Sequence, residues 1–205
     1  MDISYALSGR FLDRKNKTMA SIHDKLIRTI LIRKLNNQAI KPKAIIEELR
    51  VHNGNAIADV VALYKDAHCF EIKGDSDKIE RAVKQGNYFN LSFRRITLVT
   101  TSKHLNKAIE FLPKFWGIMI AERKDGKVTL KYIRRARNNS CFDKSQALLM
   151  LWKSEMLTLI EQHNNITKND SRRLLAQLIS RSKKKVELSN NISSVLLSRH
   201  YQTSS

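Results

Sequence analysis

The sequence predicts a mixed α/β fold, with strands of mixed direction in one sheet and an all-helical extension at the C-terminal end. Short runs of β-branched and apolar residues alternate with amphipathic segments as far as residue 133, whereas helical periodicity alone follows. Hydrophobic residues make up 42% of the 205 residues, and only 6 Gly and 2 Pro interrupt them. The chain is therefore long and apolar enough to bury a sizeable core.

The net charge restricts the class of partner. Lys and Arg number 38 against 19 Asp and Glu, which gives a formal charge of +19 at pH 7. A surplus of this size is typical of proteins that bind a polyanion, and we expect nucleic acid. Cys69 and Cys141 form neither a zinc-ligand spacing nor a disulfide framework, which is typical of a reducing compartment. The N-terminus lacks a signal-peptide pattern and no run is long enough to cross a membrane, so we expect a cytoplasmic protein without a membrane partner.

Three regions are predicted along the chain. They are an N-terminal segment without clear periodicity, a core with the mixed fold, and a basic helical region: residues 1–18, 19–137 and 138–205. The first helix of the core is expected to begin at Ser21 as its cap and to end at Asn36, ahead of Pro42.

Two predicted strands joined by a tight turn carry the most informative residues. Asp59 is the one charged residue in the apolar run Ile57–Leu63, and Glu71 and Lys73 alternate with apolar residues in the next run. Because side chains alternate along a strand, Glu71 and Lys73 project from the same face. A buried carboxylate is costly unless it is paired, hydrogen-bonded or bound to a metal. We therefore expect the two carboxylates and the lysine to surround a cation.

A hard divalent cation suits these groups. Mg²⁺ prefers oxygen ligands and takes one or two protein carboxylates, so Asp59 and Glu71 would bind it with the carbonyl of Ile72 as a third ligand, and Mn²⁺ would be able to replace it. Such an ion lowers the pKa of a bound water and stabilises charge on a phosphate. Lys73 would orient that water or stabilise the developing negative charge. The predicted chemistry is hydrolysis of a phosphodiester.

The series Asp59 followed by Glu71-Ile72-Lys73 on paired strands resembles the PD-(D/E)XK nuclease superfamily, which has the restriction-endonuclease-like fold. The proline that often precedes the aspartate in that superfamily is Ala58 here. The resemblance covers about residues 45–121. It implies a Mg²⁺-dependent nuclease with an αβββαβ core.

Further positions of this pattern are present. The superfamily typically adds an upstream glutamate and a glutamine on the helix after the second strand, and Glu48 and Gln85 stand there, with Asp24 competing for the acidic role. Some branches add a tyrosine four residues after the glutamine, where this chain has Phe89 with Tyr88 beside it. Gln85 and Tyr88 would either contact a nucleic-acid backbone or lie on a solvated helix face.

The segment Lys43–Val51 fits a short helix or a strand. Asn53-Gly54 after it is a strong hairpin signal, so we expect a strand, on which Glu47 and Glu48 would point to opposite faces. The following elements then complete the order αβββαβ, ending in a further helix and a hairpin. The helix after Lys73 is expected over Lys78–Phe89, capped by the turn Gly74–Asp77.

The C-terminal region is predicted to be helical over about residues 144–163, 170–182 and 188–199. The first of these helices has a broad apolar face, which would pack on the core or belong to a DNA-docking bundle like a helix-turn-helix. Arginines along the chain are expected to contact nucleic acid: Arg94, Arg95, Arg134, Arg135, Arg172 and Arg173.

Two functions of different classes follow from these observations. The first is a Mg²⁺-dependent nuclease that cleaves DNA. The second is a nucleic-acid-binding or regulatory protein, for example of a phage or mobile element, that keeps the nuclease fold without turnover, since contacts of Lys and Arg with phosphates suffice for affinity. RNA as the substrate stays open, and so does a homodimer, because related folds often dimerise to cut both strands.

Overall fold

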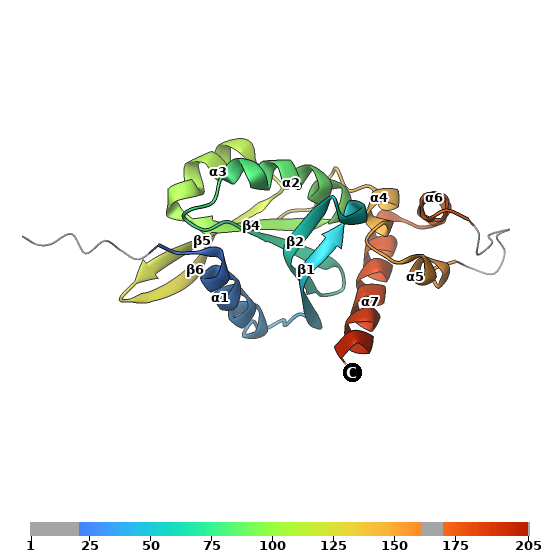
Figure 1. Ribbon diagram of the computed structural model, residues 1–205, viewed down its shortest axis with the longest axis horizontal. Coiled ribbons are helices and arrows are strands. Elements are labelled where there is room, and N and C mark those ends of the chain that lie inside the picture. Colours follow the sequence, from blue (N-terminus) through green and yellow to red (C-terminus); the bar gives the residue numbers. More distant parts are fainter. Residues whose placement is uncertain (1–20, 161–169, 205) are drawn as a thin grey trace, which may run out of the picture.

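The computed structural model describes residues 21–160 and 170–204, which form one six-stranded sheet covered by helices (Figure 1). The sheet is mixed, which confirms the prediction of a mixed α/β fold. The predicted N-terminal segment, residues 1–18, lies outside the described residues.

The strands follow one another in chain order across the sheet. The first three pair antiparallel, the third, fourth and fifth pair parallel, and the last two form an antiparallel hairpin. Their bounds are β1 Ala44–Val51, β2 Ala56–Leu63, β3 Ala67–Ile72, β4 Arg95–Thr101, β5 Gly117–Lys124 and β6 Lys127–Arg134. The prediction of a strand over residues 43–51 is therefore confirmed.

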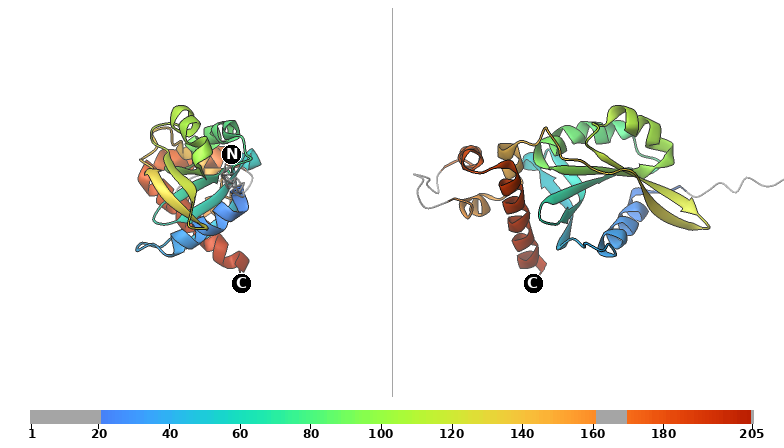
Figure 2. Two further views of the ribbon diagram at one scale, coloured as in Figure 1. Left: turned by 90° about the vertical axis from the view of Figure 1, so that its left-hand side faces the viewer. Right: turned by 180° about the vertical axis from the view of Figure 1, so that it is seen from behind.

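Helices cover both faces of the sheet (Figure 2). Helix α1 (Asp24–Asn36) packs on one face, where Ile27 meets Val60 in a buried cluster. Helices α2 (Ile79–Ser92) and α3 (Leu105–Phe111) cover the other face, which explains why the central strands are apolar on both sides.

Two predicted helix caps are wrong. Helix α1 begins at Asp24, and its cap is His23, whose Nδ1 accepts a hydrogen bond from the Leu26 N–H at 3.2 Å. Helix α2 begins at Ile79 without a side-chain cap and runs to Ser92, beyond the predicted end. The Asp77 carboxylate closes the preceding turn instead of capping the helix, because it accepts a hydrogen bond from the Gly74 N–H at 2.7 Å.

The turn after Lys73 is hydrogen-bonded to, and closely packed against, the start of α1. The carboxylate of Asp75 accepts the Ile22 N–H at 2.6 Å. A Cβ on Gly74 would lie 2.8 Å from the Ile22 carbonyl oxygen and 2.9 Å from the Asp24 nitrogen, so any larger residue there would push the helix away. Burial alone would raise the pKa of Asp75, but the Ile22 N–H and nearby positive charge lower it.

The C-terminal region is helical, in four pieces: α4 Lys144–Leu148, α5 Lys153–Leu157, α6 Arg172–Ser182 and α7 Lys185–Ser204. The single helix expected from residue 144 is interrupted, because the Glu155 carboxylate accepts the Trp152 N–H at 2.6 Å and starts a new helix. Its expected end near residue 163 lies outside the described residues. Leu148, Leu175 and Leu196 share one buried cluster with the α2 face of the sheet, so these helices pack on the core. No helix in the described part of the chain is both long and apolar enough to cross a bilayer.

Candidate functional site

The two predicted carboxylates meet where β2 and β3 run side by side. Val60 pairs with Phe70, which places Asp59 across from Glu71 on the neighbouring strand. The Asp59 side chain reaches β3, where its Oδ2 accepts the Ile72 N–H at 2.8 Å. The spacing of the two residues in the sequence thus predicts their approach correctly.

Glu71 and Lys73 form a buried ion pair. Both side chains are at least nine-tenths buried, and Lys73 Nζ lies 2.5 Å from Glu71 Oε1. The same ammonium donates to the Ile72 carbonyl oxygen at 3.0 Å. The second carboxylate oxygen, Glu71 Oε2, is buried and has no hydrogen-bond partner. Leaving a buried acceptor unpaired costs about 1–3 kcal/mol, so a ligand at this oxygen would be favoured.

The pKa of Glu71 reflects this environment. Burial and, after it, the charge of the neighbouring Asp59 carboxylate raise it from its ordinary value of 4.5 to about 8, and Lys73 opposes this rise. Burial and the Asp59 charge therefore favour the protonated form of Glu71, whereas the Lys73 ammonium favours the carboxylate.

The oxygen atoms near Glu71 are of the kind that a small divalent cation takes as ligands. Glu71 Oε2 has no partner, whereas the Asp59 carboxylate accepts from the Ile72 N–H and Arg28 and the Ile72 carbonyl accepts from Lys73. Mg²⁺ commonly binds through one or two carboxylates with water in its other positions. Within residues 21–160 and 170–204, no group of three or more His, Cys, Asp or Glu side chains is placed to hold a metal ion. A metal at this site would therefore depend on the backbone carbonyl and on water.

Arg28 of α1 belongs to the site, although the sequence did not single it out. Its guanidinium lies 3.1 Å from both Asp59 and Glu48 and 3.5 Å from Glu47. Burial alone would lower the pKa of Arg28, but these carboxylates raise it. On the sequence, Arg28 is one of several cations on the polar face of an amphipathic helix, and no local signal distinguishes it.

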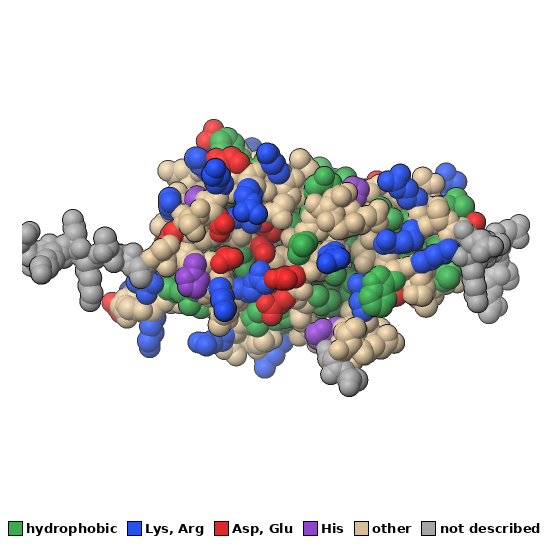
Figure 3. Space-filling view, in the orientation of Figure 1, with side chains coloured by type: hydrophobic (Ala, Val, Ile, Leu, Met, Phe, Trp, Pro, Cys, Tyr) green, Lys and Arg blue, Asp and Glu red, His purple; other side chains and the backbone are tan. Residues whose placement is uncertain are grey.

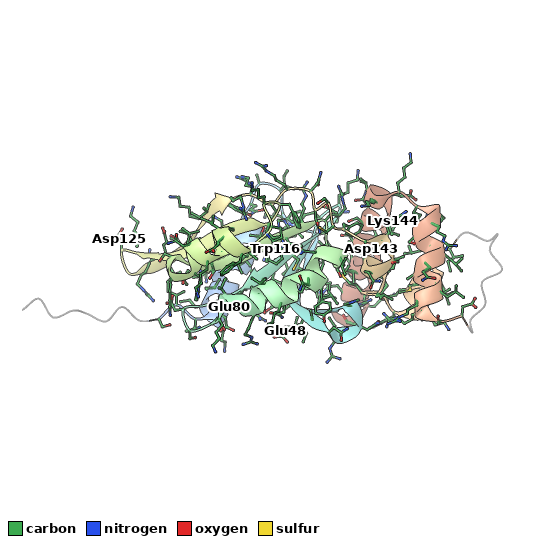
Figure 4. The ribbon with its side chains drawn as sticks, turned by 90° about the horizontal axis from the view of Figure 1, so that it is seen from above. Glu48, Glu80, Trp116, Asp125, Asp143 and Lys144 are labelled. Carbon is green, nitrogen blue, oxygen red and sulfur yellow. The ribbon has the colours of Figure 1, made fainter. Side chains whose placement is uncertain are left out.

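Glu48 lies at the rim of the site, not in it. It is exposed, and Figure 4 shows it at the margin of the molecule, away from the interior Trp116. The expectation that Glu47 and Glu48 point to opposite faces is wrong, because both contact Arg28. Glu48 has a φ of 56°, in the left-handed region, which interrupts the alternation of side chains along β1.

Both candidates for the extra acidic role lie beside one open groove. Asp24, Arg28 and Glu48 are among the residues that line it, and its volume is about 610 Å³. Acidic side chains gather near the middle of this face of the molecule, with Lys and Arg on either side (Figure 3).

The two predicted residues of α2 lie outside the carboxylate cluster. Gln85 is half-buried and makes no hydrogen bond to Glu71 or Lys73 in the described part of the chain. Tyr88 packs against the core, with its ring centre 5.0 Å from that of His52.

Arg94 and Arg95 lie at the opposite end of the sheet from the carboxylates. Arg95 pairs with His68 at the start of β3 and β4, whereas Glu71 is near the end of β3. Both arginines approach Asp66, at 3.4 Å and 3.8 Å. The structure therefore does not bring them to the candidate site.

The other arginines have different surroundings. Arg134 donates to the Trp116 carbonyl at 2.8 Å, and Arg172 donates to the Leu149 and Leu151 carbonyls, both at 2.7 Å. These bonds hold backbone segments together. The Arg135 guanidinium lies 5.0 Å from the centre of the Tyr132 ring, and Arg173 lines a small groove with His52; neither forms an ion pair with Asp59 or Glu71 within residues 21–160 and 170–204.

The raised pKa of Glu71 predicts a pH-dependent stability. A carboxyl whose pKa is higher in the folded chain stabilises the fold fully below pH 4.5, and this contribution is lost as the pH rises through about 8. We expect the free energy of unfolding to fall by up to about 1.4 kcal/mol per pH unit in this window, and the decline to disappear in Glu71→Gln. Urea unfolding of both proteins at several pH values, without metal, measures it.

His68 serves as an internal check on this experiment. Burial and the charge of Arg95 lower its pKa to about 3, so it contributes the opposite pH dependence, and it is present in both proteins. Parallel curves for the two proteins between pH 5 and pH 8 would contradict a shifted Glu71.

Comparison with known proteins gives three findings. The family described as Bacteriophage P4 protein cII matches residues 17–205. Protein cII of Enterobacteria phage P4 is 29% identical over 129 residues, which are 63% of this chain and 49% of that protein, so the match spans about half the length of the relative. A protein of unknown function from Silicibacter pomeroyi is structurally similar over 62% of this chain and 85% of its own, with 16% identity and a TM-score of 0.38.

Proposed function

This chain belongs to the Bacteriophage P4 protein cII family, and we propose that it is a metal-dependent nuclease that hydrolyses phosphodiester bonds of DNA. One observation carries the proposal: a fully buried glutamate lies beside an aspartate and a lysine, and one of its oxygens has no partner. Burying such a carboxylate is costly, and a cation that binds there offsets the cost. Asp59, Glu71 and Lys73 are therefore the residues on which the activity would depend.

The order of elements supports the same proposal. Helix α1, strands β1 to β3, helix α2 and strand β4 follow one another as αβββαβ, the order that the resemblance to the PD-(D/E)XK superfamily implies. The aspartate lies on the second strand of this core and the Glu-x-Lys series at the end of the third.

The residues of the site would have two roles, metal binding and stabilisation of charge on the phosphate. Asp59, Glu71 and the Ile72 carbonyl would hold Mg²⁺, or Mn²⁺ in its place, and the bound ion would supply an activated water and neutralise charge on the phosphate. Because the pKa of Glu71 is raised, the ion would compete with protons for this carboxylate, and its binding would strengthen as the pH rises. Lys73 lies beside Glu71 Oε1, and its ammonium would donate to the phosphate oxygens or orient the water.

A second function is favoured by the contacts of Arg28. Its guanidinium already compensates Asp59 and Glu48, so the acidic cluster is stable without a metal ion. A nucleic-acid-binding or regulatory protein that keeps this fold without turnover would have the same arrangement. Its affinity would come from the positive net charge of +19.

Cleavage assays separate the two functions. The protein is incubated with linear, circular and single-stranded DNA and with RNA, in Mg²⁺, in Mn²⁺ and in a chelator. A nuclease cleaves at least one DNA form with metal and none in the chelator, and the circular substrate distinguishes endonuclease from exonuclease action. Salt-sensitive binding without cleavage of any substrate would overturn the nuclease proposal in favour of the binding protein.

A further inference from the structure

A second groove adjoins the site on the other side of β1. Its volume is about 420 Å³, and it lies between β1 and the C-terminal helices. Glu48 lines both this groove and the groove of about 610 Å³ beside α1, so the two meet at this residue. A flexible chain lying in one of them can continue into the other, toward Arg28 and Asp59.

Trp152 presents an aromatic surface to this second groove. The residue is 54% exposed, which is unusual for a side chain of this size. The guanidinium of Arg199 lies 4.4 Å from the centre of its ring. Arg199 is fixed in turn by an ion pair with Glu155 and by a hydrogen bond to the Met150 carbonyl at 3.1 Å. The indole is thus held in one place before any ligand arrives.

The charge of the groove is positive and partly uncompensated. The charge of Arg199 is offset by Glu155, but Arg172 is bonded to two neutral carbonyls, and its Nε has no hydrogen-bond partner. Arg50 on β1 is exposed and forms no ion pair with any described residue. The exposed cation Arg50 in a groove with a fixed aromatic ring matches the phosphates and bases of a nucleic-acid strand.

We propose that this groove binds single-stranded nucleic acid, with a base stacked on Trp152 and a phosphate held by Arg50, and with the charge of Arg172 adding to the positive potential. Stacking requires an unpaired base, which a duplex does not offer, so the groove selects single strands or frayed ends. The strand then passes Glu48 toward the carboxylates. That last step rests on the proposed nuclease function, whereas the binding does not.

Tryptophan fluorescence tests the binding directly. The chain has two tryptophans, and Trp116 is fully buried with its indole N–H bonded to Asn90 at 2.7 Å. Any quenching by a ligand at the surface therefore reports Trp152. A short single-stranded oligodeoxynucleotide, added in a chelator so that nothing is cut, is expected to quench this fluorescence, and a duplex of the same sequence is expected to quench it much less.

Variants test the same point through affinity, measured by fluorescence anisotropy of a labelled oligonucleotide. Trp152→Ala is expected to weaken binding by about 10-fold, because it removes the stacking of one base, and Trp152→Phe should retain most of the affinity. Arg50→Gln should weaken binding and reduce its dependence on salt. Phe111→Ala is the matched control, because Phe111 is a similarly exposed aromatic residue on α3, at 45%.

The outcomes distinguish this inference from the nuclease proposal. Quenching of the wild-type protein in the chelator, with weaker binding by the Trp152→Ala and Arg50→Gln variants, supports binding of single strands in this groove. This holds even if no DNA is cleaved with metal. If the wild-type protein cleaves DNA but its fluorescence does not change when the oligonucleotide is added, the proposed binding in this groove is wrong and the nuclease proposal is unaffected. If a single strand and a duplex of the same sequence quench the fluorescence equally, the proposal that an unpaired base stacks on Trp152 is wrong.

Discussion

The Asp59→Ala protein is expected to lose metal-dependent cleavage of DNA by about 10³-fold or more, while its affinity for DNA in a chelator stays nearly unchanged. Asp59 would supply one of only two carboxylate ligands, so without it the metal is bound weakly and in the wrong place. The change removes the acceptor of the Ile72 N–H, which costs about 1–3 kcal/mol of stability, but Arg28 keeps its contact with Glu48 and no buried charge loses its partner. Cleavage rates and anisotropy titrations of the two proteins measure both effects.

Asp66→Ala is the matched control for this experiment. Asp66 is also a partly buried aspartate paired with an arginine, Arg94, at 3.4 Å, but it lies at the other end of β3. Its loss should leave cleavage near the wild-type rate. If Asp59→Ala cleaves as fast as the wild type, the nuclease proposal is wrong.

The Lys73→Met protein is expected to cleave DNA about 10²-fold to 10³-fold more slowly, because the methionine fills the space of the lysine stem without an ammonium to stabilise developing charge. The substitution also removes a positive charge that lowers the pKa of Glu71. The rising limb of the pH–rate profile should therefore move to higher pH. Cleavage rates over a range of pH, at one metal concentration below saturation, measure both changes.

Lys103→Met is the control for Lys73→Met. Lys103 donates to the Asp75 carbonyl at 2.7 Å, close in the chain to the turn after β3, but its charge faces solvent. We expect its variant to retain the wild-type rate and pH profile. A normal rate and an unmoved profile for Lys73→Met would exclude Lys73 from the reaction.

The central elements of the fold were predictable because their signals are local. The Asn53-Gly54 turn and the apolar runs on either side of it predict the pairing of β1 with β2, and the structure contains it. The approach of Asp59 to Glu71 follows from the same hairpin reasoning, because residues equally distant from a turn face one another.

The rest of the site depends on contacts between distant segments. Arg28 reaches Asp59 only because α1 packs across the sheet, and the polar face of a helix does not reveal which of its cations will do so. Arg94 and Arg95 are near Lys73 in the sequence, yet the parallel pairing of β3 and β4 carries them to the far end of the sheet. The break at Trp152 depends on one local hydrogen bond, which helical periodicity does not detect.

The close packing of Gly74 against the start of α1 has a consequence for the speed of ligand binding. The close approach at Gly74 and the Asp75 carboxylate join the start of the helix that carries Arg28 to the turn that follows Lys73. A cation that displaces Arg28 and Lys73 from the carboxylates of the site needs only new side-chain rotamers, not a hinge motion on the microsecond to millisecond timescale. Stopped-flow traces of metal binding should accordingly show a single phase whose rate rises linearly with metal concentration, without a conformational plateau.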